Sequence, residues 1–142
     1  MLMKKKRILV IDDNVNATRI VKFSLERTGR FEVRELNDPS QALDAAHEFR
    51  PDLVLLDVCM PHIEGSEVAE EISNHPDFTA TPIVFVTSIV TPREANKQGT
   101  LVVGRHEYIA KPARLETIVA CIDRHLARDA QKSPPAEYTA HA

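Results

Sequence analysis

The sequence predicts an α/β domain built around a mainly parallel sheet, because short β-rich runs alternate with segments of helical periodicity. One run, residues 53–56, is apolar throughout, as is typical of a strand buried on both faces. The chain has 142 residues, 43% of them hydrophobic, which is enough for one domain with one core. We therefore expect a single domain in which strands and helices alternate.

Five strands are expected. They are residues 7–11, 31–36, 53–56, 83–86 and 107–109. Residues 15–28 are expected to form the first helix, which ends before Gly29, a residue suited to a left-handed C-terminal position. Asp38 can cap the second helix, with Pro39 in its first turn, and Pro51 ends it.

The later helices are predicted from the spacing of apolar residues. Residues 65–74 carry theirs on one face. The last helix has the clearest period, since its apolar residues fall at i, i+3, i+4, i+7 and i+11 from Leu115 to Leu126. Residues 91–103 fit less well, because a polar stretch precedes Gly99 and the apolar residues follow it. A short or irregular fourth helix is expected there.

The two ends of the chain differ in composition from the middle. Residues 1–6 form a basic N-terminal lead, and residues 7–128 hold the expected domain. Residues 129–142 are small and polar with no periodic apolar face, so we expect a flexible tail. We therefore expect no separate output domain within these 142 residues.

Composition argues against several functions. A net charge of −3 gives no global basic field for nucleic-acid backbones, and the basic residues 4–7 are more typical of a solvated run. Every apolar stretch is far shorter than the roughly 20 residues that span a bilayer, and no secretory signal pattern is present. Cys59 and Cys121 have no metal-type spacing and are interpreted as free thiols. Nucleic-acid and membrane binding are not expected, and a cytoplasmic location is.

Residues capable of chemistry follow four of the predicted strands. They are Asp12-Asp13, Asp57, Thr87-Ser88 and Lys111-Pro112. In an open parallel sheet, ligands bind beyond the carboxyl ends of the strands. Three carboxylates, a hydroxyl and an ammonium should therefore meet at one edge of the sheet.

The three carboxylates of Asp12, Asp13 and Asp57 would repel one another without a counter-charge. A divalent cation removes that repulsion, and oxygen ligands without His or Cys indicate Mg²⁺, which is often completed by phosphate oxygens. A lysine and a hydroxyl beside such an ion suit a phosphoryl group. Asp57 is then the candidate nucleophile, since aspartyl phosphates are a known covalent intermediate.

The chain resembles the receiver domain of two-component response regulators, of the single-domain chemotaxis type. The matching segments are residues 8–13, 52–61 with Gly65, 86–88 and 108–112. Their order and their positions at strand ends are specific in combination. The resemblance covers residues 7–128 and implies a flavodoxin-like, doubly wound sheet of five parallel strands in the order 2-1-3-4-5, with helices on both faces.

The resemblance also implies roles for the acidic residues. Asp57 would be the phosphoacceptor. Asp12, Asp13 and Asp57 would hold Mg²⁺ together with the backbone carbonyl of Cys59. The thiol of Cys59 has no role in this scheme.

Further roles follow for residues of the last two strands. The hydroxyl of Thr87 would bind one phosphoryl oxygen and Lys111 another, with a cis bond between Lys111 and Pro112. Tyr108 matches the position of an aromatic switch whose ring turns as Thr87 moves, although a packed edge aromatic is an equally good reading. Ser88 matches a position that is small in the family, where bulk would block the phosphodonor.

The implied function is a phosphoaccepting switch that catalyses its own phosphorylation and dephosphorylation. Its phosphodonor would be a sensor histidine kinase or a histidine phosphotransfer protein, and it would act by docking to a further protein or by passing the phosphoryl group on. Residues 104–106 depart from the small pair usual in the family. By this resemblance, they would lie on the face that the family uses for partners.

Two other functions share part of this pattern. A phosphatase of the haloacid-dehalogenase type also uses an aspartyl nucleophile, but it carries a second Asp two positions later, where this chain has Cys59. A flavin or nucleotide binder of similar fold would need a glycine-rich phosphate loop. The four glycines of the chain form no such motif.

Overall fold

The computed structural model describes residues 4–88, 99–103 and 106–132. Six strands form the main sheet, in the spatial order β2-β1-β3-β6-β8-β7. They are β1 (Lys6–Ile11), β2 (Phe31–Leu36), β3 (Leu53–Leu56), β6 (Ile83–Thr87), β7 (Thr100–Val103) and β8 (His106–Ala110). The predicted five parallel strands and their order are confirmed, because β7 is the only antiparallel member of this sheet in the described part of the chain.

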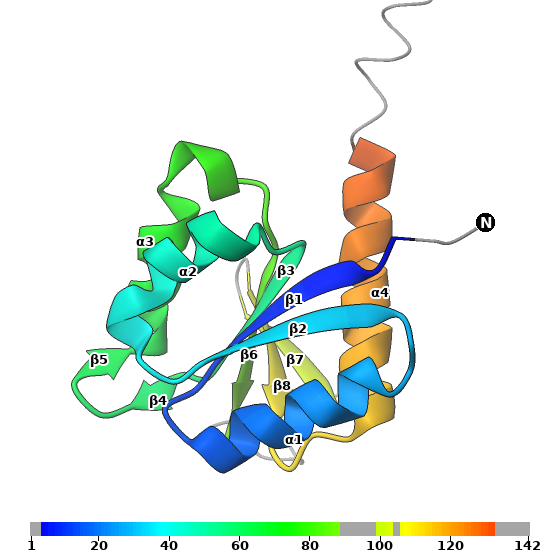
Figure 1. The fold of residues 1–142 in the computed structure, drawn as a ribbon, viewed down its shortest axis with the longest axis horizontal. Coiled ribbons are helices and arrows are strands. Elements are labelled where there is room, and N and C mark those ends of the chain that lie inside the picture. Colours follow the sequence, from blue (N-terminus) through cyan, green and yellow to red (C-terminus); the bar gives the residue numbers. More distant parts are fainter. Residues whose placement is uncertain (1–3, 89–98, 104–105, 133–142) are drawn as a thin grey trace, which may run out of the picture.

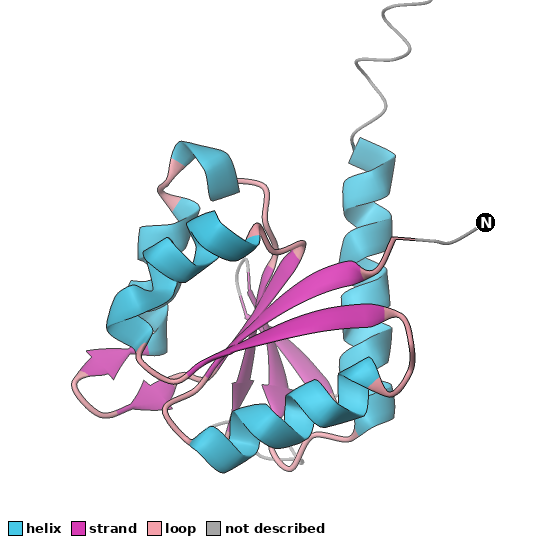
Figure 2. Cartoon of the chain, viewed as in Figure 1, coloured by secondary structure: helices cyan, strands magenta, loops and turns pink. Residues whose placement is uncertain are grey.

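Helices cover both faces of the sheet (Figure 1). They are α1 (Val15–Glu26), α2 (Ala42–Phe49), α3 (Gly65–Ser73) and α4 (Leu115–Lys132). Helices α2 and α3 lie on one face, and α1 and α4 on the other (Figure 2). Short 3₁₀ turns, η1 (Pro39–Gln41) and η2 (Pro76–Phe78), and a small hairpin of β4 (Cys59–Met60) with β5 (Ile63–Glu64) complete the described elements.

Local sequence accounts for where several elements begin. Asn14 caps α1 by accepting a hydrogen bond from the backbone N–H of Ala17 at 3.1 Å. Asp38 accepts in the same way from Ser40 at 3.1 Å. Asp38 therefore caps the turn η1, and α2 starts only after it. The predicted capping residue is right, but the element it caps is the turn that leads into the helix.

The core has two parts, one on each face of the sheet. Side chains of β1 alternate between them, with Leu9 and Ile11 facing α2 and α3, and Ile8 and Val10 facing α1 and α4. The four residues of β3 alternate in the same way, and all are at least 98% buried. This confirms the prediction of a strand buried on both faces.

The fourth helix predicted at residues 91–103 is wrong for its described part. Residues 100–103 form β7, which pairs antiparallel with β8. The run Thr-Leu-Val-Val is rich in β-branched residues, and Gly99 precedes it with φ +84°, a left-handed conformation that turns the chain into the strand. Residues 91–98 lie outside the described residues.

The last helix is longer than its apolar period predicts. Helix α4 continues to Lys132, four residues into the tail expected from residue 129. The rest of that predicted tail, residues 133–142, lies outside the described residues. Within the described ranges, no helix is long and apolar enough to cross a lipid bilayer.

Candidate functional site

The predicted polar residues do meet at the carboxyl edge of the sheet. Backbone hydrogen bonds extend the pairing of the strands by one residue and so fix the positions of the polar residues that follow them. The N–H of Asp57 donates to the carbonyl of Ile11 at 3.0 Å, and the N–H of Lys111 donates to the carbonyl of Thr87 at 3.0 Å. The ends of β1 and β3, and those of β6 and β8, are therefore held at the same level.

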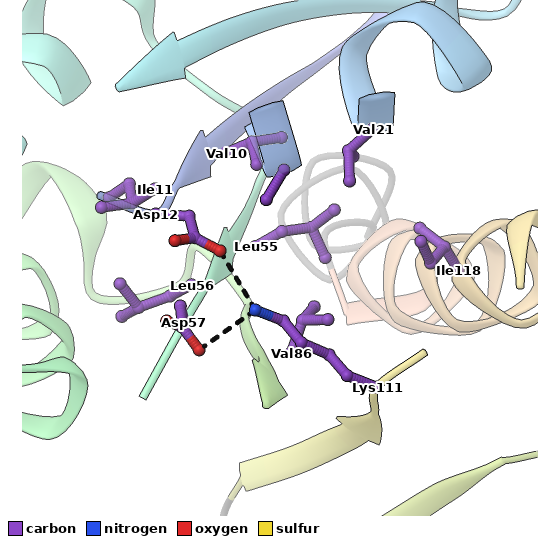
Figure 3. A pocket seen from close by; sticks show the side chains of 11 residues that line it. Val10, Ile11, Asp12, Val21, Leu55, Leu56, Asp57, Val86, Lys111 and Ile118 are labelled. Carbon is purple, nitrogen blue, oxygen red and sulfur yellow. Dashed lines mark hydrogen bonds and ion pairs between the residues drawn. The ribbon is translucent and has the colours of Figure 1, made fainter. Parts of the chain in front are cut away.

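The ammonium group of Lys111 lies between two carboxylates (Figure 3). Its Nζ is 3.1 Å from Oδ2 of Asp12 and 3.5 Å from Oδ1 of Asp57. Asp12 is 6% exposed and Asp57 7%, so both carboxylates depend on protein groups for much of their stabilisation. The predicted cis peptide bond between Lys111 and Pro112 is present.

These contacts shift the ionisation of the site. Burial raises the pKa of Asp57 above 3.8, and the neighbouring Asp12 adds to the rise, while Lys111 and the backbone N–H of Cys59 oppose it. Burial lowers the pKa of Lys111, but attraction to Asp12 and then Asp57 outweighs it, so the pKa lies above 10.5. Lys111 therefore keeps its positive charge at neutral pH, where it favours the ionised form of Asp57.

The acidic residues have the composition and spacing of a hard-cation site. Asp12, Asp13 and Asp57 each offer a carboxylate oxygen, and these oxygens lie within 4.8 Å of one another. Asp13 is exposed, so the cluster is open to solvent on one side. Oxygen donors on an open site, with water positions to spare, fit Mg²⁺.

Cys59 takes part through its backbone. Its N–H hydrogen-bonds the carboxylate of Asp57, while its thiol is exposed. The predicted role of its carbonyl as a metal ligand stays a prediction. Ser88 is exposed directly after β6.

Thr87 and Tyr108 lie on adjacent strands. Thr87 is fully buried at the end of β6, opposite Ala110 in the register with β8. The ring of Tyr108 stacks on Phe85, with ring centroids 5.0 Å apart and planes 18° from parallel. Tyr108 is only half-buried, so its ring has solvent on one side and a fixed aromatic surface on the other.

Gly65 allows the backbone of α3 to approach the site closely. Its N–H donates to the carbonyl of Val58 at 2.9 Å. A Cβ atom at this position would overlap the carbonyl oxygen of Asp57 and come within 2.8 Å of the Cα of Val58. In the sequence Gly65 stands out only as part of a motif, and the contact explains why a glycine is needed there.

Sequence reasoning missed the residues that support Asp12 from the side of β2. The side-chain amide of Asn37 donates to the carbonyl of Asp12 at 2.8 Å and to Oγ1 of Thr18 at 2.9 Å. The hydroxyl of Thr18 in turn donates to Glu35 at 2.9 Å. The one available signal was the position of Asn37, directly after a predicted strand.

Behind the carboxylates, the wall of the site is apolar. A cavity of about 50 Å³ lies there and is lined largely by aliphatic side chains, among them Val21, Leu55, Val86 and Ile118 (Figure 3). Such a lining offers few partners for a water molecule. The polar chemistry is therefore confined to the open side of the site.

Comparisons with known proteins agree with this geometry. A family model described as the response regulator receiver domain matches residues 8–123. The chain is 30% identical over 132 residues to the alkaline phosphatase synthesis transcriptional regulatory protein PhoP of Bacillus subtilis, covering 93% of this chain and 53% of that protein. It is 35% identical over 130 residues to the probable transcriptional regulator ycf27 of Galdieria sulphuraria, covering 88% and 48%. It thus spans about half the length of these relatives.

Solved structures show the same fold. The chemotaxis protein CheY4 of Vibrio cholerae superposes with a TM-score of 0.71 at 28% identity, over 85% of this chain and 98% of that one. A CheY-like response regulator receiver domain protein from Methanospirillum hungatei gives a TM-score of 0.74 at 22% identity, over 92% and 100%. The second likeness bears on the fold alone.

Proposed function

The chain belongs to the response regulator receiver family, and we propose that it is a signalling switch that accepts a phosphoryl group on Asp57. The observation that carries the proposal is the environment of this carboxylate. Asp57 is 93% buried at the end of β3, with Lys111 at 3.5 Å and the carboxylates of Asp12 and Asp13 beside it. A buried nucleophile with a fixed cation and a divalent-cation site is the arrangement that phosphoryl transfer needs.

In the proposed reaction, a carboxylate oxygen of Asp57 attacks the phosphorus of a phosphohistidine on the donor. The P–N bond breaks, the histidine nitrogen leaves with the bonding pair, and an acyl phosphate forms. Mg²⁺, held by Asp12, Asp13, Asp57 and the carbonyl of Cys59, would screen the charge of the incoming phosphoryl group. Lys111 stays charged and is placed to bind one phosphoryl oxygen, and the hydroxyl of Thr87 another.

In the loss of the phosphoryl group, Asp57 becomes the leaving group and water the nucleophile. Water attacks the phosphorus, the P–O bond to Asp57 breaks, and inorganic phosphate leaves. The side chain two positions after Asp57, that of Cys59, flanks the approach of this water. It is a thiol and has no carboxyl or amide group that could orient the water. We therefore propose that the chain dephosphorylates itself slowly.

The proposed partners follow from this chemistry. A sensor histidine kinase or a histidine phosphotransfer protein would supply the phosphoryl group, in the cytoplasm. A further protein would read the phosphorylated state, with no direct binding to nucleic acid. Thr87 would move toward the phosphoryl group, and Tyr108 would turn with it.

The test is phosphate uptake. Incubation with acetyl phosphate and Mg²⁺ should add one phosphoryl group to the wild type by intact mass, and none to Asp57→Asn. Asp44→Asn, a matched change at an exposed position of α2, should behave like the wild type. Equal uptake by Asp57→Asn would contradict the proposal. Sustained turnover of p-nitrophenyl phosphate by the wild type would favour the phosphatase instead.

A further inference from the structure

A basic hollow lies at the edge of the sheet opposite Asp57. It has a volume of about 330 Å³. Its lining comes from the start of β1 and the two residues before it, from the residue directly after α2 and from the residue directly before β3. The lining residues are Lys4, Lys5, Lys6, Arg7, Arg50 and Asp52. These segments lie at the amino ends of neighbouring parallel strands, so the hollow and the site of Asp57 are at opposite ends of the same strands.

The charges of the hollow are almost all positive and mostly uncompensated. Five of its six lining residues are basic, although the whole chain has a net charge of −3. The one carboxylate, that of Asp52, accepts a hydrogen bond from the backbone N–H of Arg7 at 2.8 Å. Among the described residues, the side chains of Lys4, Lys5, Lys6 and Arg7 form no ion pair within 4.0 Å. Like charges held together in this way favour an anion as a ligand.

Both arginines of the hollow are held in place by aromatic rings. The guanidinium of Arg7 lies 4.6 Å from the ring centroid of Phe49, and its buried Nε finds no hydrogen-bond partner in the described part of the chain. Arg50 lies 5.5 Å from the ring centroid of Phe78 and pairs with Asp77 at 3.1 Å. Its backbone is left-handed, with φ 54°. These contacts restrain both guanidinium groups before any ligand arrives, which lowers the entropy cost of binding, and Arg50 would keep its pair with Asp77.

We propose that this hollow binds a small anion that carries two or more phosphate groups. Several separate cations line it, so a ligand with several charged groups engages more of them than a single phosphate does. Its volume is within the range of small-ligand pockets. A nucleic-acid strand needs an extended basic surface, which a chain of net charge −3 does not provide. Binding here does not depend on the chemistry of Asp57.

Sodium pyrophosphate is the probe for this site, used with EDTA so that no divalent cation is present. Backbone amide NMR shifts should saturate and be confined to residues 4–7, 50 and 52. The affinity should be at least about fivefold weaker in Lys4→Gln/Lys5→Gln and in Arg50→Gln, because each lost cation removes a charge-assisted contact. The double variant Arg19→Gln/Lys22→Gln removes the same charge as the lysine pair from α1, away from the hollow, and should bind like the wild type.

Further measurements distinguish a specific site from general charge attraction and from the chemistry of Asp57. Asp57→Asn should bind pyrophosphate with the same affinity as the wild type. The proposal for the hollow and the proposal for Asp57 can therefore be disproved separately. Specific binding becomes weak in the millimolar range of dissociation constants. The proposal is therefore overturned if the NMR shifts do not saturate up to about 10 mM pyrophosphate. Equal weakening in the control double variant overturns it too. Vesicles of phosphatidylglycerol or duplex DNA that bind residues 4–7 while pyrophosphate does not would identify a membrane or nucleic-acid surface instead.

Discussion

Gly65 is a residue of the site at which an added Cβ atom would overlap the backbone. Its Cα faces the carbonyl of Asp57 and the Cα of Val58, which are backbone atoms and cannot rotate away as a side chain can. A methyl group added at this position must push apart α3 and the loop that follows β3. Because that loop begins at Asp57, strain at Gly65 should reach this proposed phosphoacceptor directly.

We predict that Gly65→Ala destabilises the protein by roughly 3 kcal/mol, the upper part of the range for overpacking, and slows phosphate uptake. Gly29→Ala is the matched control. Gly29 has φ +78°, and no atom would lie within 4 Å of an added methyl group, so this change should cost only about 1 kcal/mol of left-handed strain. Urea denaturation measures both changes. Equal losses of stability in the two variants would contradict the close-contact explanation.

Which site residues could be predicted depended on where each one stands in the sequence. Asp12, Asp57, Thr87 and Lys111 come after the predicted strands, and parallel strands must end at a common edge, so their meeting could be derived without coordinates. Asn37 also follows a strand, but its role depends on which way an amide side chain points. That direction is set by tertiary packing, which the sequence does not reveal.

At the scale of elements, β7 shows where sequence reasoning failed. The expectation of a short or irregular helix came from the polar residues between Pro92 and Gln98, which start like a solvated helix. The residues themselves, Thr100 to Val103, are β-branched or aliphatic, and pairing with β8 gives their backbone hydrogen-bond partners. A segment this short cannot be assigned from periodicity alone, so the pairing partner decided the outcome.

Strand β8 is tied to α4 through a buried carboxylate. Glu107 is 4% exposed and accepts two hydrogen bonds from the guanidinium of Arg124, at 2.9 and 3.0 Å, and one from His125 at 2.9 Å. Burial alone would raise the pKa of Glu107, but the hydrogen bonds from Arg124, Thr100 and His125 lower it to about 2. Burial, and then the nearby Glu107, raises the pKa of the Cys121 thiol to about 12, so this thiol stays protonated.

We predict that Glu107→Gln lowers stability by roughly 2–3 kcal/mol at pH 7, since a pKa lowered from 4.5 to about 2 corresponds to about 3 kcal/mol. A carboxyl with a lowered pKa stabilises the fold above its unfolded-state pKa and loses that effect as the pH falls through its folded-state value. The gap between variant and wild type should therefore shrink from pH 4.5 down to about 2. Urea denaturation across this range measures the gap. Glu116→Gln, at an exposed position of α4, is the control and should change stability by less than about 0.5 kcal/mol.

For the whole molecule, the proposed switch predicts a response far from the phosphoryl group. Lys111 is joined to Thr87 by a backbone hydrogen bond, and Thr87 lies on the same strand as Phe85, on which Tyr108 stacks. A phosphoryl group adds about −1.5 to −2 charge, and Thr87 and Lys111 are placed to follow it. Movement at the end of β6 should therefore reach β8 and the edge strand β7.

We predict that beryllofluoride with Mg²⁺ changes amide hydrogen exchange in β7 and β8 as well as around Asp57. Thr87→Ala should still accept the phosphoryl group but lose most of the distant change, because the ligand acts only through its different affinity for two states. Tyr108→Ala should respond near Asp57 and less in β7. Changes confined to the loops around Asp12, Asp57 and Lys111 in the wild type would disprove the coupling.

The alternation of side chains along β1 and β3 also has a thermodynamic consequence. Each of these strands contributes side chains to both parts of the core. Loss of packing in one part should therefore disorder the strands on which the other part depends. Heating should therefore melt the two parts in one cooperative transition, with equal calorimetric and van't Hoff enthalpies. Two resolved heat-absorption peaks in differential scanning calorimetry would show that the faces melt independently. In that case, the packing on one face of the sheet would not depend on the packing on the other face.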